Sequence, residues 1–147
     1  MGAPSRYRQA LAGLPLFAGL DAGHIDRIWD LGSFNIIPAG TVLTRDGEQG
    51  MEAYLILEGT VEIQRPDGRR IHVGPYELVG EMSLLEGDTN RRSATVVTLD
   101  PIRCLVINRH YFQRLMIDEP LLHQHVKARI AEYLTDNERG EAAAVNL

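Results

Sequence analysis

Residues 78–94 read LVGEMSLLEGDTNRRSA, and this stretch interrupts the β-pattern of the chain with a helix-like run bounded by two glycines. Around it lie short β-rich runs separated by glycine turns, at residues 53–57, 60–64, 71–73, 94–99 and 102–107. Short strands at regular spacing are typical of a β-roll, a sandwich or a small barrel. We therefore predict a β-domain over about residues 33–107.

Helical patterns flank this β-domain. Before it, Ser5 and Asp21 are candidate N-caps of two short helices, and after it Asn108 and Pro120 mark the start of two more. The last helix carries an apolar stripe at helical spacing, formed by Leu122, Val126, Ile130 and Tyr133. The sequence predicts a mainly β fold with two N-terminal and two C-terminal helices.

The length and composition fit one domain. The 147 residues include 15 Lys+Arg and 20 Asp+Glu, a formal net charge of −5. We expect a single domain over residues 1–147, with a core at about 14–135 and a flexible tail over 137–147. The acidic balance argues against nucleic acid as a direct partner, because neutralising phosphates needs clustered Lys and Arg.

The sequence also bears on cellular location and cysteine chemistry. No apolar run approaches the ~18 residues of a membrane span, and the N-terminus lacks the apolar region of a signal peptide. We therefore expect a cytoplasmic protein without a membrane span. The lone Cys104 excludes an internal disulfide and a cysteine-based zinc site, and we expect it to be a small buried apolar side chain.

The interrupting stretch carries groups suited to an anion. A helical turn opening at Gly80 would expose the backbone N–H groups of Glu81, Met82 and Ser83, and such N-termini attract phosphates. Glu81 can accept a hydrogen bond from a hydroxyl but not from an ionised phosphate. Arg92 adds a positive charge and a planar set of donors. A ligand with one phosphate charge and a free ribose 2′-OH matches these groups, as a 3′,5′-cyclic nucleotide does.

In this order the stretch resembles the phosphate-binding cassette of the cyclic nucleotide-binding domain family. That cassette reads approximately Phe-Gly-Glu-x-small-Leu, then a variable loop, then Arg-(Ser/Thr)-Ala. The resemblance extends over about residues 14–133 and includes the segments 15–17, 38–40 and 54–59. The chain is thus similar to the sensor domains of catabolite-activator-type regulators and of cyclic nucleotide-gated channels, which implies a β-roll (a jelly-roll barrel) with flanking helices.

The resemblance also implies roles for individual residues. Glu81 would bind the ribose 2′-OH and Arg92 the cyclic phosphate. Backbone N–H groups of Met82 and Ser83, with the Ser93 hydroxyl, would complete the phosphate site. Arg91 competes for the phosphate role, but the register with the following Ser-Ala favours Arg92.

Two positions depart from the family pattern. Val79 replaces the usual Phe, and Tyr76 stands where the family often has Gly in a Gly-Pro-Gly-Asp turn. Both lie beside the polar groups of the cassette, so we interpret them as packing changes.

The resemblance implies a sensor that performs no catalysis. Its ligand would be cAMP, favoured by Ser93 in place of Thr, with cGMP as the second possibility. The last helix would close over the base as a lid, with Arg129 or Tyr133 stacking on the purine, although Tyr133 equally fits the packing stripe. The effector is not identifiable from the sequence. A second copy of the chain could pair through the apolar stripe of the last helix.

Two other readings stay open. Glu81 and Arg92 could form a salt bridge in an empty roll, which would make the chain a nucleotide-independent interaction module. A cupin-like metalloenzyme on a similar barrel would need clustered metal ligands. The five histidines (24, 72, 110, 123 and 125) do not have such spacing, so we expect no metal site.

Overall fold

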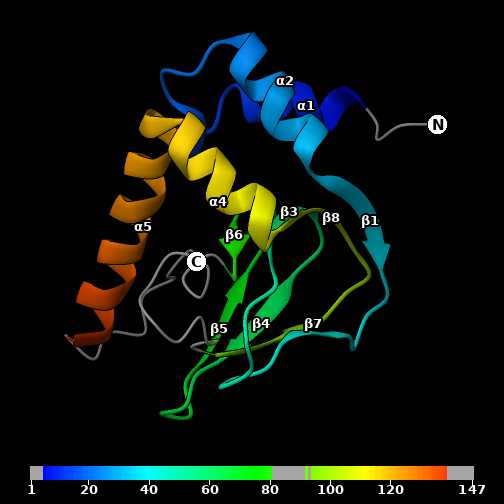
Figure 1. Ribbon diagram of the computed structural model, residues 1–147. Helices are drawn as coiled ribbons and strands as arrows, with labels where there is room; N and C mark the ends of the chain where they lie inside the picture. The colour runs from blue at the N-terminus through cyan, green and yellow to red at the C-terminus, as the bar shows by residue number, and fades with distance from the viewer. Residues whose placement is uncertain (1–4, 81–91, 93, 139–147) are drawn as a thin grey trace.

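The computed structural model describes residues 5–80, 92 and 94–138, with side chains up to residue 132 (Figure 1). The helices are α1 (Ser5–Leu11), the short 3₁₀ helix η1 (Pro15–Phe17), α2 (Ala22–Leu31), α4 (Arg109–Asp118) and α5 (Pro120–Glu138). The strands are β1 (Ser33–Ile37), β2 (Val42–Thr44), β3 (Glu52–Glu58), β4 (Val61–Gln64), β5 (Arg70–Val73), β6 (Leu78–Val79), β7 (Thr95–Thr98) and β8 (Ile102–Asn108).

The strands form two four-stranded antiparallel sheets. One sheet has the order β1-β8-β3-β6 and the other the order β2-β7-β4-β5. Neighbours in each sheet are mostly far apart in the sequence, so the chain passes repeatedly from one sheet to the other, as it does in a β-roll. Figure 1 shows α1 and α2 at one end of the roll, α4 across it and α5 along its side. The predicted fold class, mainly β with flanking helices, is confirmed.

The helices begin close to the predicted positions. The Asp21 side chain accepts a hydrogen bond from the backbone N–H of His24 at 3.0 Å, and Asn108 caps α4 in the same way through Tyr111 at 2.9 Å. These bonds satisfy backbone donors that have no partner inside the helix. Ser5 differs from its prediction as a cap, because it lies within α1.

Strand β3 separates two apolar cores. Ala53, Leu55 and Leu57 belong to the core beneath the helices, whereas Tyr54 and Ile56 belong to the core between the two sheets. Successive side chains of a strand point to opposite faces, so a single strand can line both cores. Cys104 of β8 is buried in the core between the sheets, as predicted, and burial raises its thiol pKa to about 12.

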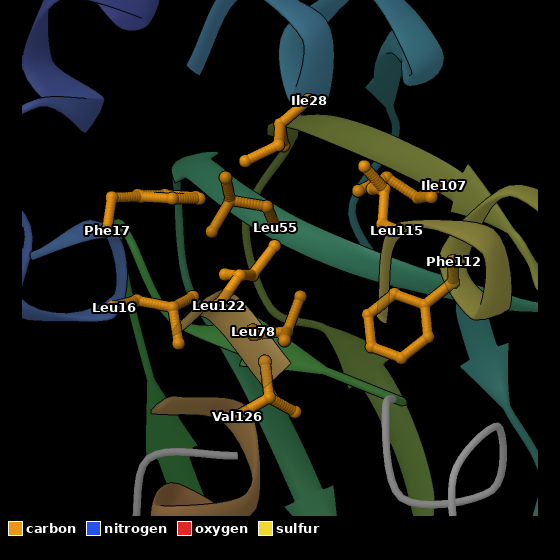
Figure 2. Close-up of a pocket in the computed structure, with 10 residues that line it drawn as sticks. All are labelled: Leu16, Phe17, Ile28, Leu55, Leu78, Ile107, Phe112, Leu115, Leu122 and Val126. Atoms are coloured by element: carbon orange, nitrogen blue, oxygen red, sulfur yellow. The ribbon is translucent and has the colours of Figure 1, made fainter. Parts of the chain in front are cut away.

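The core beneath the helices retains a narrow apolar cavity of about 20 Å³ (Figure 2). It is lined by Leu16, Phe17, Ile28, Leu55, Leu78, Ile107, Phe112, Leu115, Leu122 and Val126. Such a volume holds about one water molecule, so the cavity is a packing gap between helices and sheet rather than a ligand site.

The apolar stripe of α5 packs into this core. Leu122, Val126 and Ile130 are each at most 4% exposed. The proposal that a second copy pairs through this stripe is therefore wrong for these three residues, because their apolar surface is already buried within the chain. A partner of α5 would have to contact its opposite face.

Tyr76 has a backbone conformation that side chains rarely adopt. Its φ is +69°, and among the described residues every other positive φ belongs to a glycine. The left-handed region costs a non-glycine residue about 1–2 kcal/mol. The Tyr76 side chain, partly buried against the core beneath the helices, supplies compensating contacts. The departure at Tyr76 is thus a backbone change as well as a packing change, whereas Val79, fully buried between the sheets, is a packing change.

We predict that Tyr76→Gly will be more stable than Tyr76→Ala by about 1 kcal/mol. Both variants lose the ring, but a positive φ strains alanine and does not strain glycine. Chemical denaturation of the two proteins, followed by circular dichroism, measures the difference. Equal stabilities, or a more stable Ala variant, would show that the backbone at residue 76 carries no strain.

Candidate functional site

The structure brings Arg92 and Gly80 together. Arg92 is 7% exposed, and its Nη1 donates a hydrogen bond to the Gly80 carbonyl oxygen at 3.0 Å. Its backbone N–H donates to the Glu48 carbonyl at 2.7 Å, and its own carbonyl accepts from Gly47 N–H at 3.0 Å. The backbone of Arg92 is therefore fixed on the segment between β2 and β3, and its side chain reaches the end of β6.

Two features of the structure favour glycine at position 80. Its φ is +85°, in the left-handed region. A β-carbon there would lie 2.7 Å from Arg92 Nη1 and 3.1 Å from the Glu52 carbonyl oxygen, closer than side chains normally pack. The sequence predicted a close approach of the Gly80 backbone to a ligand. In the structure, the close neighbours are the guanidinium group and the first residues of β3.

Tyr54 and Glu52 lie beside this pair and were not predicted as site residues. The buried Tyr54 hydroxyl has two acceptors within reach, Glu52 Oε1 at 2.9 Å and the Leu43 carbonyl oxygen at 3.2 Å. Burial raises the pKa of Tyr54 well above its usual range, the Glu52 carboxylate raises it further, and the positive charge of Arg92 opposes the shift. The alternation of side chains along β3 is the sequence signal that could have identified Glu52 and Tyr54, because residues 52, 54 and 56 share one face of the strand.

Arg92 is the group at this site best suited to an anion. An arginine side chain remains protonated in proteins and presents five N–H donors in one plane. Removing such a charge from water is costly unless a partner compensates, and an anionic ligand is one such partner. A phosphate presents two oxygens that match the geometry of the guanidinium group.

Several predicted site residues lie outside the described part of the chain. They are Glu81, Met82, Ser83, Arg91 and Ser93, together with the side chain of Tyr133. Their assignment to the ribose, the phosphate or the base therefore stays a prediction, as does the helix-like run that begins at Gly80.

Arg129 forms an ion pair with Glu77. The contact joins Nη2 of Arg129, on α5, to Oε2 of Glu77, in the turn that leads into β6, and both side chains are about one-fifth exposed. Burial raises the pKa of the Glu77 carboxyl above its ordinary value, and Arg129 counteracts the rise. The predicted lid residue thus connects α5 to the start of the segment that ends at Gly80.

Three of the five histidines that were considered as metal ligands have other side-chain contacts. His24 pairs with Glu119 at 2.6 Å, His72 with Glu62 at 2.9 Å, and His125 lies 2.9 Å from the Ala18 carbonyl oxygen. Within residues 5–80, 92 and 94–138, no three His, Cys, Asp or Glu side chains gather as metal ligands would. In the same part of the chain, no helix combines the length and the apolar character needed to cross a bilayer.

Comparison with known sequences and structures places this geometry in context. A cyclic AMP receptor protein of Thermus thermophilus is 30% identical over 86% of this chain and 60% of its own length. A cyclic nucleotide-gated potassium channel of Rhizobium etli is 32% identical over 86% of this chain and 35% of the channel. The crystal structure of the Thermus thermophilus catabolite activator protein aligns with a TM-score of 0.75 and 30% identity, over 86% of this chain and 61% of that one.

The chain therefore spans about one-third to three-fifths of the length of these relatives. The sequence profile described as "Cyclic nucleotide-binding domain" matches residues 35–119, which is more than half of the chain and includes Gly80, Arg92 and most of the roll. This chain belongs to the cyclic nucleotide-binding domain family.

Proposed function

We propose that this domain binds cAMP as a regulatory module, with Arg92 holding the cyclic phosphate. The observation that carries the proposal is the buried guanidinium group, fixed against Gly80 at the end of β6. The names of two relatives, a cyclic AMP receptor protein and a cyclic nucleotide-gated channel, point to the same ligand class. cGMP is the competing ligand, because the choice of base depends on contacts beyond the phosphate.

The remaining polar contacts follow from the chemistry of the ligand. Glu81 would accept a hydrogen bond from the ribose 2′-OH, since a carboxylate can accept from a hydroxyl but repels a phosphate. Met82 and Ser83 would donate backbone N–H groups to the phosphate, and the Ser93 hydroxyl would add one more donor. These assignments rest on the family pattern of residues 80–94.

The switch would pass from the cassette to the helices through residues 77–80. Glu77 is paired with Arg129 of α5, and Leu78 lines the apolar cavity together with Phe112 of α4 and Val126 of α5 (Figure 2). A phosphate that moves the segment after Gly80 would therefore disturb contacts with both helices. A ligand can drive such a change only by binding one arrangement more tightly than the other.

The output is proposed at the level of class. The domain would act on an effector domain or on a partner protein, because the two relatives named as a channel and as a receptor protein have chains that extend beyond the part matched here. If a second copy of the chain takes part, it would contact α5 on the face opposite Leu122, Val126 and Ile130, which are buried.

We predict that excess cAMP raises the unfolding temperature of the protein. A ligand at ~100 times its Kd adds about 2.7 kcal/mol to stability, equivalent to roughly 5–10 °C for a domain of this size. Arg92→Met should abolish the shift, because it keeps an apolar stem but removes the guanidinium group. Arg45→Met, at an exposed position in the neighbouring loop, is the matched control and should keep the shift.

Thermal unfolding with cAMP, and separately with cGMP, gives the ranking of the two ligands. A wild-type protein that shifts with neither nucleotide would refute the proposed function and favour a nucleotide-independent interaction module. A full shift of the unfolding temperature in Arg92→Met would show that Arg92 does not hold the phosphate.

A pair of glycine variants tests the position of the guanidinium group. Gly80→Ala should weaken cAMP binding about tenfold or more, because the new methyl group would displace Arg92 Nη1 by occupying space 2.7 Å away. Gly40→Ala is the control, since Gly40 has a similar φ of +79° and a β-carbon there would meet no atom within 4 Å. Both variants should lose about 1 kcal/mol of stability from backbone strain. Isothermal titration calorimetry that gave both variants the wild-type affinity would contradict the site.

The ion pair between α5 and the turn before β6 gives a further prediction. Arg129→Met and Glu77→Gln should each weaken cAMP binding about three- to fivefold, because a partly buried ion pair contributes about 1 kcal/mol to the contact that holds α5 in place. The double variant should be no weaker than either single variant, since the two groups act as one contact. Weaker binding in Arg129→Met alone would instead indicate that Arg129 contacts the base, as a lid residue would.

A further inference from the structure

The backbone of Arg92 is bonded to the connection between β2 and β3. Its N–H donates to the Glu48 carbonyl oxygen at 2.7 Å, and its carbonyl oxygen accepts from the Gly47 N–H at 3.0 Å. Both partners belong to a loop rather than to a sheet. These two bonds therefore position Arg92 only if residues 47–48 are themselves held in place.

The Thr44 side chain holds the start of this connection. Thr44 is the last residue of β2 and is 4% exposed. Its hydroxyl donates a hydrogen bond at 2.8 Å to the carbonyl oxygen of Ala94, two residues after Arg92. The Asp46 backbone N–H adds a second bond, to the Thr95 hydroxyl, at 3.0 Å. Residues on both sides of Arg92's loop contacts are thus fastened to the chain that leads into β7.

A β-bulge in β2 explains why a side chain makes this contact. The register between β2 and β7 shifts by one residue at Leu43, between the pairs Val42–Val97 and Thr44–Val96. A bulge leaves one residue outside the regular pairing and redirects the side chains around it. The ladder of β2 with β7 ends at Thr44, so the Thr44 hydroxyl, rather than a further backbone pair, continues the contact toward Arg92.

We propose that Thr44 is a positioning residue of the phosphate site, which keeps the β2–β3 connection, and through it Arg92, in the arrangement that binds the ligand. The inference rests on the proposed function. A guanidinium group that is already held in place costs less to order when the ligand binds. Without the hydroxyl, the buried Ala94 carbonyl loses its donor and the connection leaves this arrangement part of the time. The apparent affinity then falls with the fraction of protein that remains competent to bind.

The first test measures the affinity for cAMP by isothermal titration calorimetry. Thr44→Val keeps the shape of the side chain but removes the hydroxyl, and should weaken binding about five- to tenfold, the factor associated with one buried hydrogen bond. Thr44→Ser retains the hydroxyl and should bind within about twofold of the wild type. A serine variant that binds as weakly as the valine variant would overturn the proposal.

Thr98→Val is the matched control. Thr98 is also buried, at 1% exposed, and its hydroxyl donates to the Pro38 carbonyl oxygen at 2.7 Å and accepts from the Thr41 N–H at 2.9 Å. It lies at the end of β7 remote from Arg92. Thr98→Val should lower the unfolding temperature at least as much as Thr44→Val, because it removes two bonds, but should keep the affinity within about twofold of the wild type. An equal loss of affinity in both valine variants would overturn the proposal, since general destabilisation would then explain it.

The second test uses the protein without nucleotide. Amide hydrogen exchange, followed by NMR, reports how often the Gly47 and Arg92 N–H groups lose their partners. Both amides should exchange about tenfold faster in Thr44→Val than in Thr98→Val, with the amides of β8 as the reference for global opening. Equal rates in the two variants would overturn the inference whatever the nucleotide results. Faster exchange in a protein whose wild type binds neither cAMP nor cGMP would instead refute the proposed function, and with it a role of Thr44 in ligand binding.

Discussion

The two cores of this domain share one wall, strand β3, whose residues Ala53 to Leu57 are all buried. Each of its larger apolar side chains contributes about 1.5–3 kcal/mol through burial. Because β3 lies between β8 and β6 in its sheet, it also fixes where β6 ends. The N-terminal end of the strand is where the apolar pattern stops. There the Glu52 carboxylate accepts a hydrogen bond from the Tyr54 hydroxyl, and the Glu52 carbonyl oxygen and the Arg92 guanidinium group both lie close to Gly80. The polar site thus lies at the end of β3, where the run of buried apolar residues stops and charged residues begin.

Four consecutive residues, 77–80, lie in four different surroundings. Glu77 pairs with α5, Leu78 lines the cavity beneath the helices, Val79 is buried between the sheets, and Gly80 lies against Arg92. The alternation of a two-residue strand produces the separation of Leu78 from Val79. A displacement at Gly80 would therefore be felt in both cores and at α5, since close-packed interiors transmit small shifts.

The buried charged residues of the described chain lie at two places. Arg92 is beside β6, and Glu119, 3% exposed, is at the junction of α4 and α5. Glu119 pairs with His24 of α2, and the preceding Asp118 pairs with Arg27 of the same helix. Buried charges are costly unless they are compensated, so both places are held by specific partners rather than by apolar packing alone. The junction of the two C-terminal helices is thereby fastened to α2, while the middle of α5 is fastened to Glu77.

The sequence alone determined the order of elements and the helix starts at Asp21 and Asn108, and it placed Gly80 and Arg92 in one motif. These follow from local signals: periodicity, capping residues and a motif of fixed order. Tertiary structure alone decided that the stripe of α5 is buried in the chain's own core, that Arg129 pairs with Glu77, and that the backbone of Glu52 lies close to Gly80. An apolar stripe does not specify what covers it, and a charged residue does not specify its partner. Those choices depend on contacts between residues far apart in the sequence, which exist only once the sheets and helices have packed.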